Sequence, residues 1–499
     1  MARPPAYSLS VSAFRDLAGQ GNLIPLYREI LADYETPVSA FAKIDHGPAA
    51  YLFESVEGGE HWGRYSFLGS GAPLVIREDR GACLVSRGAK STRVPIGGNP
   101  LEYLQKLMAE YQPMTVPGLP RFVGGAVGYL GYDVVRAFED ILPRRKDSLD
   151  LPDFAFLLAD TLLIFDRVAQ TIKVVANAHV PSRKDADLRR AYHDATGRIE
   201  RMITRLTQPL RRTRPKQRRT PMTFSSNMTR AEFEKMVIRT KDYIQAGDII
   251  QAVLSQRWET RIQTTPFQIY RALRAVNPSP YMYYLRVAGI ELVGSSPETL
   301  VRCEDGRISV RPIAGTRRRG TTDEQDLALE RELLADAKER AEHVMLVDLG
   351  RNDVGRVAKP GSVQVDTLMR VERYSHVMHM VSEVTGALAR GRTVYDVMKA
   401  CFPAGTVSGA PKIRAMQVIE ELEPTKRGPY AGAVGYFGFS GNMDTCINIR
   451  TVVIKGHKAY IQAGAGIVAD SDPDREYDET CNKAKAMMKA IELAERGLE

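Results

Sequence analysis

The order of the short strand-like and helical segments constrains the fold more than any other feature of the sequence. Strand-like segments come in hairpin-like pairs more often than they alternate regularly with helices, which indicates an α+β fold with largely antiparallel sheets. In the C-terminal part we predict helices over 229–246, 265–276, 324–349, 393–401, 409–423 and 474–496, and strands over 249–260, 281–287, 290–294, 299–303, 307–313, 431–439, 444–455 and 458–463. In the N-terminal part we predict helices over 12–19, 24–33, 101–111 and 184–206, and strands over 38–44, 49–54, 73–77, 155–166 and 170–176.

One internal similarity links the two parts of the chain. The segments "GAVGYLGY" at 125–132 and "GAVGYFGF" at 432–439 share six of eight positions. Both alternate glycine or alanine with larger residues, as in strands that another backbone or a ligand approaches closely. We therefore expect each part to contribute an equivalent strand to one structure. Chance similarity between two glycine-containing strands is the alternative.

A basic tract divides the sequence. Residues 201–222, "RMITRLTQPLRRTRPKQRRTPM", contain eight Arg and Lys and no acidic residue, so most of the net charge of +9 lies there. Its three prolines and lack of an apolar period indicate a solvated linker, with a docking patch for an acidic surface as the alternative. We predict an N-terminal region at 1–205, a basic linker at 206–222 and a catalytic region at 223–499.

Length, composition and cysteine usage exclude several classes of protein. A chain of 499 residues is too long for one small core, so two or more folding units are expected. No apolar run is long enough to span a membrane, and the N-terminus lacks the apolar segment of a signal peptide. The five cysteines are scattered and never form a CxxC pair, which favours a cytoplasmic protein without a disulfide framework or a zinc site.

Two predicted helices each place a pair of glutamates one turn apart. Glu339 and Glu342 lie in the segment 338–353, and Glu476 and Glu479 lie near the start of the helix predicted over 474–496, with Lys483 one turn later. Exposed acidic turns would explain each pair alone. Together the pairs suggest a shared hard cation, and Mg²⁺ suits carboxylate oxygens completed by water and an anionic substrate.

Other polar residues occur in apolar surroundings. The strand-like run "QAGAGIV" ends in Gly464, Ala465 and Gly466, where backbone N–H groups could approach an anion. A half-buried arginine needs an anionic partner. The residues of this kind, each of which alone has an ordinary structural explanation, are Glu298, His379, Thr406, Tyr430 and Arg450.

Together these segments resemble the motifs of the chorismate-using enzymes. The similarity is carried, over about 223–495, by "IAGTRRRG", "AEHVMLVDLGRNDVGRV", "SHVMH", "GTVSGAPKIRAM", "YAGAVGY" and "QAGAGIVADSDPDREYDET". The N-terminal part also resembles the large subunit of anthranilate synthase. The resemblance implies two large, mostly antiparallel β-sheets packed face to face with helices outside.

Two positions distinguish the reactions of that family. Aminodeoxychorismate synthases have a nucleophilic lysine where this chain has Ala314, and the enzymes that add water have a lysine base where it has Gln251. Neither residue can act as nucleophile or base. The resemblance is therefore closest to anthranilate synthase, in which ammonia is its own nucleophile. It implies that chorismate and ammonia give anthranilate and pyruvate, the first step of tryptophan biosynthesis.

The resemblance also implies roles for the site residues. Glu342 and Glu479 would bind Mg²⁺, with Glu339 and Glu476 as near or water-mediated ligands, and Mg²⁺ would hold the ring carboxylate with the N–H groups of 464–466. Glu298 would be the general acid for the C4 hydroxyl, and His379 would assist pyruvate elimination. The remaining residues would bind or support the substrate: Arg450 and Tyr430 on the enolpyruvyl carboxylate, Thr406, Gly315 and Thr316 lining the pocket, and Lys483 as electrostatic support.

A partner and an inhibitor follow from the same resemblance. The family obtains ammonia from glutamine through an amidotransferase, and no cysteine here has the glycine-rich context of its nucleophile, so a separate amidotransferase subunit is expected. Tryptophan often inhibits such enzymes at a site with Leu-Leu-Glu-Ser and Asn-Pro-Ser-Pro-Tyr-Met runs. The matching residues are Glu54 and Ser55, preceded here by Phe53, and Asn277, Pro280, Tyr281 and Met282.

Three alternatives stay open from the sequence. An aminodeoxychorismate or isochorismate synthase is disfavoured by Ala314 and Gln251. A nucleic-acid-binding protein acting through the tract 211–219 leaves the glutamate pairs unexplained. A catalytically inactive tryptophan sensor is disfavoured by the complete set of catalytic candidates.

Overall fold

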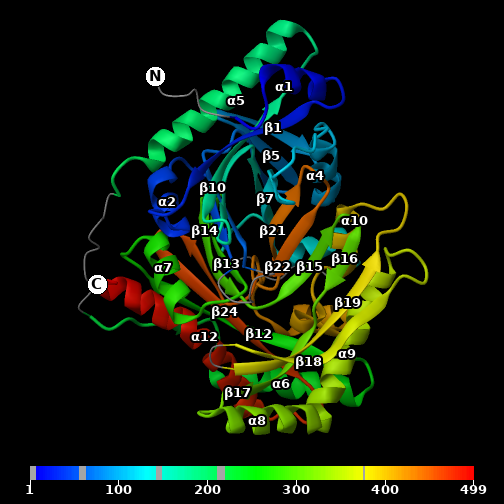
Figure 1. Ribbon diagram of the computed structural model, residues 1–499. Coiled ribbons are helices and arrows are strands. Elements are labelled where there is room, and N and C mark those ends of the chain that lie inside the picture. The colour runs from blue at the N-terminus through cyan, green and yellow to red at the C-terminus, as the bar shows by residue number, and fades with distance from the viewer. Residues whose placement is uncertain (1–6, 56–62, 142–148, 211–219, 375–376, 499) are drawn as a thin grey trace.

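Two large antiparallel sheets face each other, and the helices cover their outer sides (Figure 1). The structure is a computed structural model that describes residues 7–55, 63–141, 149–210, 220–374 and 377–498. All pairings between the named strands are antiparallel, as the hairpin-like order of segments predicts.

Each sheet contains strands from both parts of the chain. The first sheet comprises β1 (Leu23–Leu31), β10 (Thr171–His179), β9 (Thr161–Asp166), β3 (Tyr65–Ser70), β2 (Ala50–Glu54), β13 (Tyr281–Val287), β14 (Ile290–Ser296), β23 (Thr451–Lys455), β24 (Lys458–Ile467), β12 (Gln251–Arg261), β11 (Ser225–Ser226) and β20 (Gly409–Ala410). The second comprises β17 (Ile313–Arg318), β19 (Val377–Ala387), β18 (Gln364–Arg373), β16 (Arg307–Val310), β15 (Thr299–Glu304), β22 (Met443–Ile447), β21 (Ala433–Gly438), β7 (Gly125–Leu130), β8 (Phe154–Ala159), β4 (Val75–Asp79), β5 (Ala82–Arg87) and β6 (Lys90–Pro95).

The helices divide between the two outer faces. Those that pack against the first sheet are α1 (Val11–Ala18), α2 (Pro37–Ile44), α5 (Asp185–Leu206), α6 (Arg230–Gln245), α7 (Pro266–Val276), α11 (Lys412–Leu422) and α12 (Pro473–Arg496). On the second sheet's side lie α4 (Pro100–Met108), α8 (Asp323–Ala335), α9 (Ala337–Gly355) and α10 (Val394–Cys401), with the short 3₁₀ helices η1 (Tyr132–Ala137) and η2 (Gly405–Val407) at the join of the two parts.

The repeated glycine segment forms the join in the second sheet. β7 and β21 are neighbours, and Gly128 lies opposite Gly435. A Cβ on Gly128 would come within 2.1 Å of the Ala155 carbonyl oxygen, and one on Gly435 within 2.1 Å of the Asp444 carbonyl oxygen. The expectation that each part contributes an equivalent strand to one structure is confirmed, and the glycines are needed because neighbouring backbones approach closely.

The hydrophobic core has three layers. The space between the sheets is filled by side chains from both, including Tyr129, Tyr283, Leu285 and Tyr436. A second layer lies between the first sheet and its helices, and a third between the second sheet and its helices. Because the inner layer draws on both parts of the chain, the two parts are packed as one body.

Two predicted segments of the N-terminal part have the wrong type of secondary structure, and a third, the strand predicted over 155–166, is β8 in the second sheet and β9 in the first. The predicted helix over 24–33 is strand β1, and Pro25 is tolerated because β1 is the edge strand of its sheet. The predicted strand over 38–44 is helix α2, which begins with a Thr36–Ser39 capping box and Pro37 in its first turn. Those capping residues are a helix-start signal that the prediction missed.

Two predicted segments of the C-terminal part are interrupted. The helix predicted over 324–349 is two helices, because Asp336 ends α8 and caps α9. The strand predicted over 444–455 is β22 in the second sheet and β23 in the first, so the chain passes from one sheet to the other at 448–450. This passage helps to build the functional site.

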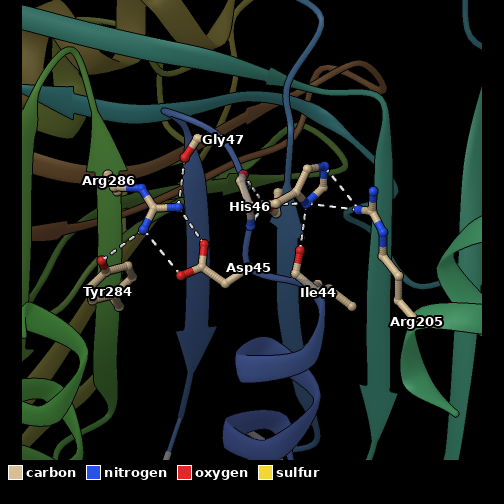
Figure 2. A network of polar contacts seen from close by, with 8 residues as sticks. Ile44, Asp45, His46, Gly47, Arg205, Tyr284 and Arg286 are labelled. Carbon is tan, nitrogen blue, oxygen red and sulfur yellow. Dashed lines mark hydrogen bonds and ion pairs between the residues drawn. The ribbon is translucent and has the colours of Figure 1, made fainter. Parts of the chain in front are cut away.

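A polar network ties the end of α2 to both parts of the chain (Figure 2). Arg286 of β13 bonds the Asp45 carboxylate and the Gly47 carbonyl, the latter at 2.9 Å. Arg205, near the end of α5, bonds the His46 ring at 2.8–2.9 Å. The network fixes the loop after α2 against the middle of the first sheet.

No helix among the described ranges combines the length and apolar character needed to cross a membrane. The tract 211–219, which we interpret as a linker, lies outside the described residues, so the predicted boundaries stay predictions.

Candidate active site

The site forms where two neighbouring strand pairs pass together from one sheet to the other. β14 and β23 pair in the first sheet, and their continuations β15 and β22 pair in the second. Glu298 lies in the β14–β15 passage and Arg450 in the β22–β23 passage. A cavity of about 660 Å³ opens at these passages, between α9, α12 and the ends of β12, β17, β19 and β24.

The cavity gathers nearly all predicted catalytic, substrate and metal residues. Its lining includes Glu298, His379, Thr406, Lys483, Gly315, Thr316, Tyr430, Arg450, Gly464, Gly466, Glu339, Glu342, Glu476 and Glu479. Residues up to 185 positions apart in the chain, such as Glu298 and Lys483, therefore meet in one place. Ala465 does not line the cavity: it is fully buried in a cluster with Leu254 and Ala415.

Glu298 is a carboxylic acid held away from water. It is 9% exposed, and this burial raises its pKa to about 8, while the Thr406 hydroxyl and Lys483 lower it by less. Its backbone carbonyl accepts a hydrogen bond from the Ile447 N–H at 3.0 Å, which links the two passages. At neutral pH the side chain is protonated, as a general acid must be.

His379 is held as a neutral imidazole, and among the described residues only its Nδ1 is hydrogen-bonded. Its Nδ1 donates to the Gly315 carbonyl at 3.2 Å and lies 3.0 Å from the Thr316 hydroxyl. Burial is the main cause that lowers its pKa, and Arg450 lowers it further. Because Nδ1 carries the proton, Nε2 is the basic nitrogen. Gly315 allows this arrangement with φ +72° at a bulge in β17.

Arg450 has a strained backbone and a largely buried charge. Its φ is +52°, unusual for a residue with a Cβ, in a bend and not inside the strand that the sequence predicted. Its Nη1 donates to the Lys483 carbonyl at 2.7 Å, and burial lowers its pKa. Tyr430 stands nearby, and burial raises its pKa to about 12, so its hydroxyl stays protonated. The pair offers donors to an anion.

Gly464 and Gly466 expose backbone N–H groups toward the cavity side of β24. Opposite them on β12, the Ser255 N–H bonds Glu423 at 2.8 Å and the Val253 N–H bonds the Ser408 carbonyl at 2.9 Å, so neither bonds β24. The N–H groups of both glycines therefore point away from β12, whereas that of Ala465 points toward it. The predicted anion cradle is thus the two glycines without Ala465.

The four glutamates face one another across the cavity. Burial is the main cause that raises the pKa of Glu342, and repulsion from Glu339 and Glu479 raises it further. Burial likewise raises the pKa of Glu476. Glu479 is ion-paired with Lys483 at 2.6 Å, and Glu339 with Arg317 at 3.1 Å. Crowded carboxylates at a cavity wall favour a cation between them.

The donor set fits Mg²⁺ of the kind that is completed by substrate. Among the described residues no three or more His, Cys, Asp or Glu side chains lie close enough to form a ready-made metal site. Mg²⁺ needs only one or two carboxylates when water and substrate oxygens fill its other positions. Glu342 is the best placed, because only the Gln251 amide, at 3.4 Å, hydrogen-bonds its carboxylate among the described residues.

Ala314 and Gln251, which distinguish the family's reactions, both line the cavity. Gln251 is 4% exposed, and its side chain packs closely against the backbone of Gly466. A Cβ at position 466 would lie 2.6 Å from Gln251 Nε2, so only glycine leaves space for this side chain. The structure therefore places no lysine at either position.

Sequence reasoning missed two polar residues at this site. Gln462 lines the cavity, and its Nε2 donates to Ser255 Oγ at 2.9 Å. Alternation along a strand would have selected Gln462, Gly464 and Gly466 together and rejected Ala465. Arg317 was missed because no local pattern shows that it bonds Glu332, Asp336 and Glu339 across two helices.

The residues predicted to bind tryptophan surround a separate small cavity of about 100 Å³. Glu54, Ser55, Pro280, Tyr281 and Met282 line it together with Phe53. Asn277 does not, because its amide donates to Ser295 Oγ at 3.0 Å. Glu54 is fully buried and accepts hydrogen bonds from Tyr270 and, at 3.2 Å, from Arg274.

Comparison with known proteins gives one consistent result. Residues 52–489 match the model of the chorismate binding enzymes. The chain is 50% identical to anthranilate synthase component 1 of Pseudomonas aeruginosa, in an alignment that covers 97% of this chain and 99% of that protein. It is 48% identical to anthranilate synthase component 1 of Acetivibrio thermocellus, in an alignment that covers 96% of this chain and 97% of that protein. The solved anthranilate synthase component I of Streptococcus pneumoniae superposes with a TM-score of 0.76 at 37% identity, covering 92% and 98%. The menaquinone-specific isochorismate synthase of Escherichia coli, at 19% identity and a TM-score of 0.69, shares the fold.

Proposed function

The chain belongs to the chorismate-binding enzymes, and among them to the anthranilate synthase component 1 proteins, and on that premise we propose how its cavity converts chorismate and ammonia into anthranilate, pyruvate and water. The observation that supports the proposal best is the single cavity that holds a protonated buried acid, a neutral imidazole and anion-binding donors.

Chorismate carries two carboxylates, and the cavity offers two places for them. Arg450 and the Tyr430 hydroxyl suit the enolpyruvyl carboxylate, since a guanidinium pairs well with a planar carboxylate. The N–H groups of Gly464 and Gly466 suit the ring carboxylate. Mg²⁺, held by Glu342 and Glu479 with Glu339 and Glu476 nearby, would supply positive charge to that ring carboxylate when bound.

In the first step ammonia forms a bond to C2, the ring double bond shifts, and the C4–O bond breaks. Hydroxide is a poor leaving group, so Glu298 gives its proton to the departing oxygen, and water leaves. The new amine nitrogen sheds one proton, which restores the acid form of Glu298. Thr406 and Lys483 flank Glu298 and stabilise its carboxylate between these transfers.

In the second step the ring becomes aromatic. His379 Nε2 takes the proton from C2, the electron pair forms the ring double bond, and the bond from C3 to the enolpyruvyl oxygen breaks. The proton passes to the methylene carbon of the departing enolpyruvate, which gives pyruvate. The Gly315 carbonyl on Nδ1 stabilises the imidazolium formed on the way.

We also propose that ammonia comes from glutamine through a separate amidotransferase subunit. The name component 1 in the relatives supports a second component. All five cysteines are unpaired, which supports action in the cytoplasm. Four are buried, and the fifth, Cys481, lies within helix α12 without the glycine-rich context of a glutaminase nucleophile.

Feedback inhibition by tryptophan is a further part of the proposal. The small cavity lined by Phe53, Glu54 and Tyr281 supports it. Tyr281 also bonds the Thr299 hydroxyl at 3.0 Å, next to Glu298, which gives the two cavities a physical connection.

The test is anthranilate fluorescence from the purified chain with chorismate, Mg²⁺ and a high concentration of ammonium. We expect a rise in fluorescence that EDTA abolishes and tryptophan suppresses. Ala314→Lys should lower the rate, because a primary amine would occupy the place of ammonia. Consumption of chorismate without fluorescence would show a sister reaction and contradict the argument from Ala314 and Gln251.

A further inference from the structure

A buried ion pair lies behind the cavity wall and has no part in the chemistry above. Arg427 donates from Nε to Glu423 Oε2 at 2.9 Å and from Nη2 to Oε1 at 2.6 Å. The two side chains are 2% and 5% exposed, and neither lines the cavity. The pair therefore meets neither substrate nor solvent.

The remaining bonds of the pair go to the backbone of the cavity wall. Arg427 Nη1 donates to the Val407 carbonyl at 2.7 Å, and Nη2 to the Val253 carbonyl at 2.6 Å. Glu423 Oε1 accepts from the N–H and the hydroxyl of Ser255, both at 2.8 Å. Val253 and Val407 line the cavity, and Val407 directly follows Thr406.

The guanidinium also lies against two tyrosine rings. Its Cζ is 4.6 Å from the ring centre of Tyr132 and 5.6 Å from that of Tyr430. Tyr132 belongs to the N-terminal part, and Tyr430 is a cavity residue. A planar guanidinium can bond a carboxylate and two carbonyls in its plane while it packs on rings, which a lysine ammonium cannot do.

Stability alone does not account for such a pair. Replacing a buried ion pair by apolar residues is often neutral or stabilising, because removing two charges from water is costly. What the partners of this pair share is their place in the wall around Tyr430 and Thr406. We propose that Arg427 is a positioning residue for chorismate, and that Glu423 holds its guanidinium in register. This inference rests on the proposed function, since it concerns the same substrate and cavity.

The neighbouring pair Lys426–Asp153 provides a matched control. Each of its side chains is 6% exposed, so it is buried like Arg427–Glu423, but among the described residues it makes no hydrogen bond to Val253, Ser255 or Val407. Glu423→Gln and Asp153→Asn each remove one carboxylate charge from a buried pair. We expect both to lower the melting temperature, because each removes a carboxylate charge that is ion-paired with a buried cation.

The variants of the Arg427–Glu423 pair and the control variant Asp153→Asn should differ in their KM for chorismate. Glu423→Gln and Arg427→Lys should raise KM for chorismate about tenfold and leave KM for ammonium within about twofold, since the wall that meets chorismate moves. Asp153→Asn should leave both constants near wild type. If Asp153→Asn raises KM for chorismate as much as Glu423→Gln does, or if neither changes it, the positioning role is wrong.

A pH profile gives a second readout. The Thr406 hydroxyl lowers the pKa of Glu298, so displacement of Thr406 should move the alkaline limb of kcat to higher pH in Arg427→Lys and not in Asp153→Asn. Calorimetric binding of chorismate needs no turnover. A wild type that binds chorismate but forms no anthranilate would contradict the proposed function, and the chorismate Kd of the three variants would still decide the positioning role.

Discussion

The two cavities differ in how their buried charges are paired: among the described residues, those of the small cavity have partners of opposite charge, and those of the large cavity largely do not. In the small cavity, Glu54 is bonded by Tyr270 and Arg274, and Asp444 by Arg302 at 2.7 Å and Tyr281 at 2.8 Å. In the large cavity, Glu342 faces other carboxylates, and the charge of Arg450 meets only a backbone carbonyl at hydrogen-bond distance among the described residues. Strands β15 and β22 contribute residues to the small cavity, and the passages next to these strands, at 297–298 and 449–450, line the large cavity.

The difference separates charges that the fold already pairs from charges that a ligand of opposite sign could pair. A charge that its neighbours satisfy stabilises the native state, and its loss leaves the partners unpaired. A charge that burial disfavours is a cost to stability that binding of an opposite charge relieves. Four substitutions test this contrast, and they follow in order of decreasing expected effect.

Glu298→Gln should have the largest effect. We expect kcat to fall by about 10²–10⁴-fold, the usual contribution of a general acid, while the chain stays folded. In the wild type, kcat should fall as pH rises through about 8, because the acid form of Glu298 is then lost. The alkaline limb should be absent in the variant. An unchanged limb would assign the titration to another group.

Arg450→Met should come next. Loss of charge-assisted bonds to a carboxylate should raise KM for chorismate about 10- to 100-fold. Because burial disfavours the Arg450 charge, the melting temperature should stay the same or rise. Arg302→Met is the control from the paired cavity: it should lower the melting temperature and spare KM for chorismate. If Arg450→Met lowered the melting temperature and Arg302→Met raised KM for chorismate, the proposed difference between the two cavities would be wrong.

Glu54→Gln should affect stability more than catalysis. It removes the charge that Arg274 and Tyr270 bond, so the free energy of unfolding should fall by about 1–3 kcal/mol in chemical denaturation. Without tryptophan, kcat with ammonium should stay within about threefold of wild type. Tryptophan inhibition should weaken. Loss of activity with full stability would place Glu54 in the catalytic machinery.

Glu342→Gln should give the smallest change in stability, and of the opposite sign. Relief of repulsion from Glu339 and Glu479 should raise the free energy of unfolding by up to about 1 kcal/mol in the absence of metal. Calorimetry with Mg²⁺ alone should show weaker binding than in wild type. A loss of stability would mean that Glu342 is already satisfied by the fold.

The sequence predicted the antiparallel α+β fold because hairpin order and strand patterns are local signals. It could not predict the passage at 448–450, since only three residues separate β22 from β23 and the whole segment has the pattern of one continuous strand. Nor does any local signal place Arg450 at φ +52°, which is rare for a residue with a side chain. The surrounding packing imposes that conformation.

The candidate site was predictable where chemistry and position agree in the sequence. Glu298, His379 and the glutamate pairs were found as residues, and the structure adds that they share one cavity. Their relative orientation was not predictable, because it depends on contacts across hundreds of residues. Ala465 is an example of a site residue that was predicted wrongly. Its sequence neighbours Gly464 and Gly466 face the cavity, whereas the pleat of β24 points Ala465 toward the opposite face.

The pairing of β7 with β21 also means that β7 is synthesised long before its partner strand. Leu130 leaves the ribosome roughly 300 residues before its partner Ala433, a wait of about 15–60 s at ordinary rates of translation. Over that time the glycine-rich edge of β7 has no partner strand, and unpaired edges invite association with other chains. Strand β2 waits likewise for β13. A nascent chain of this protein therefore has two open sheet edges, one until β13 is made and the other until β21 is made.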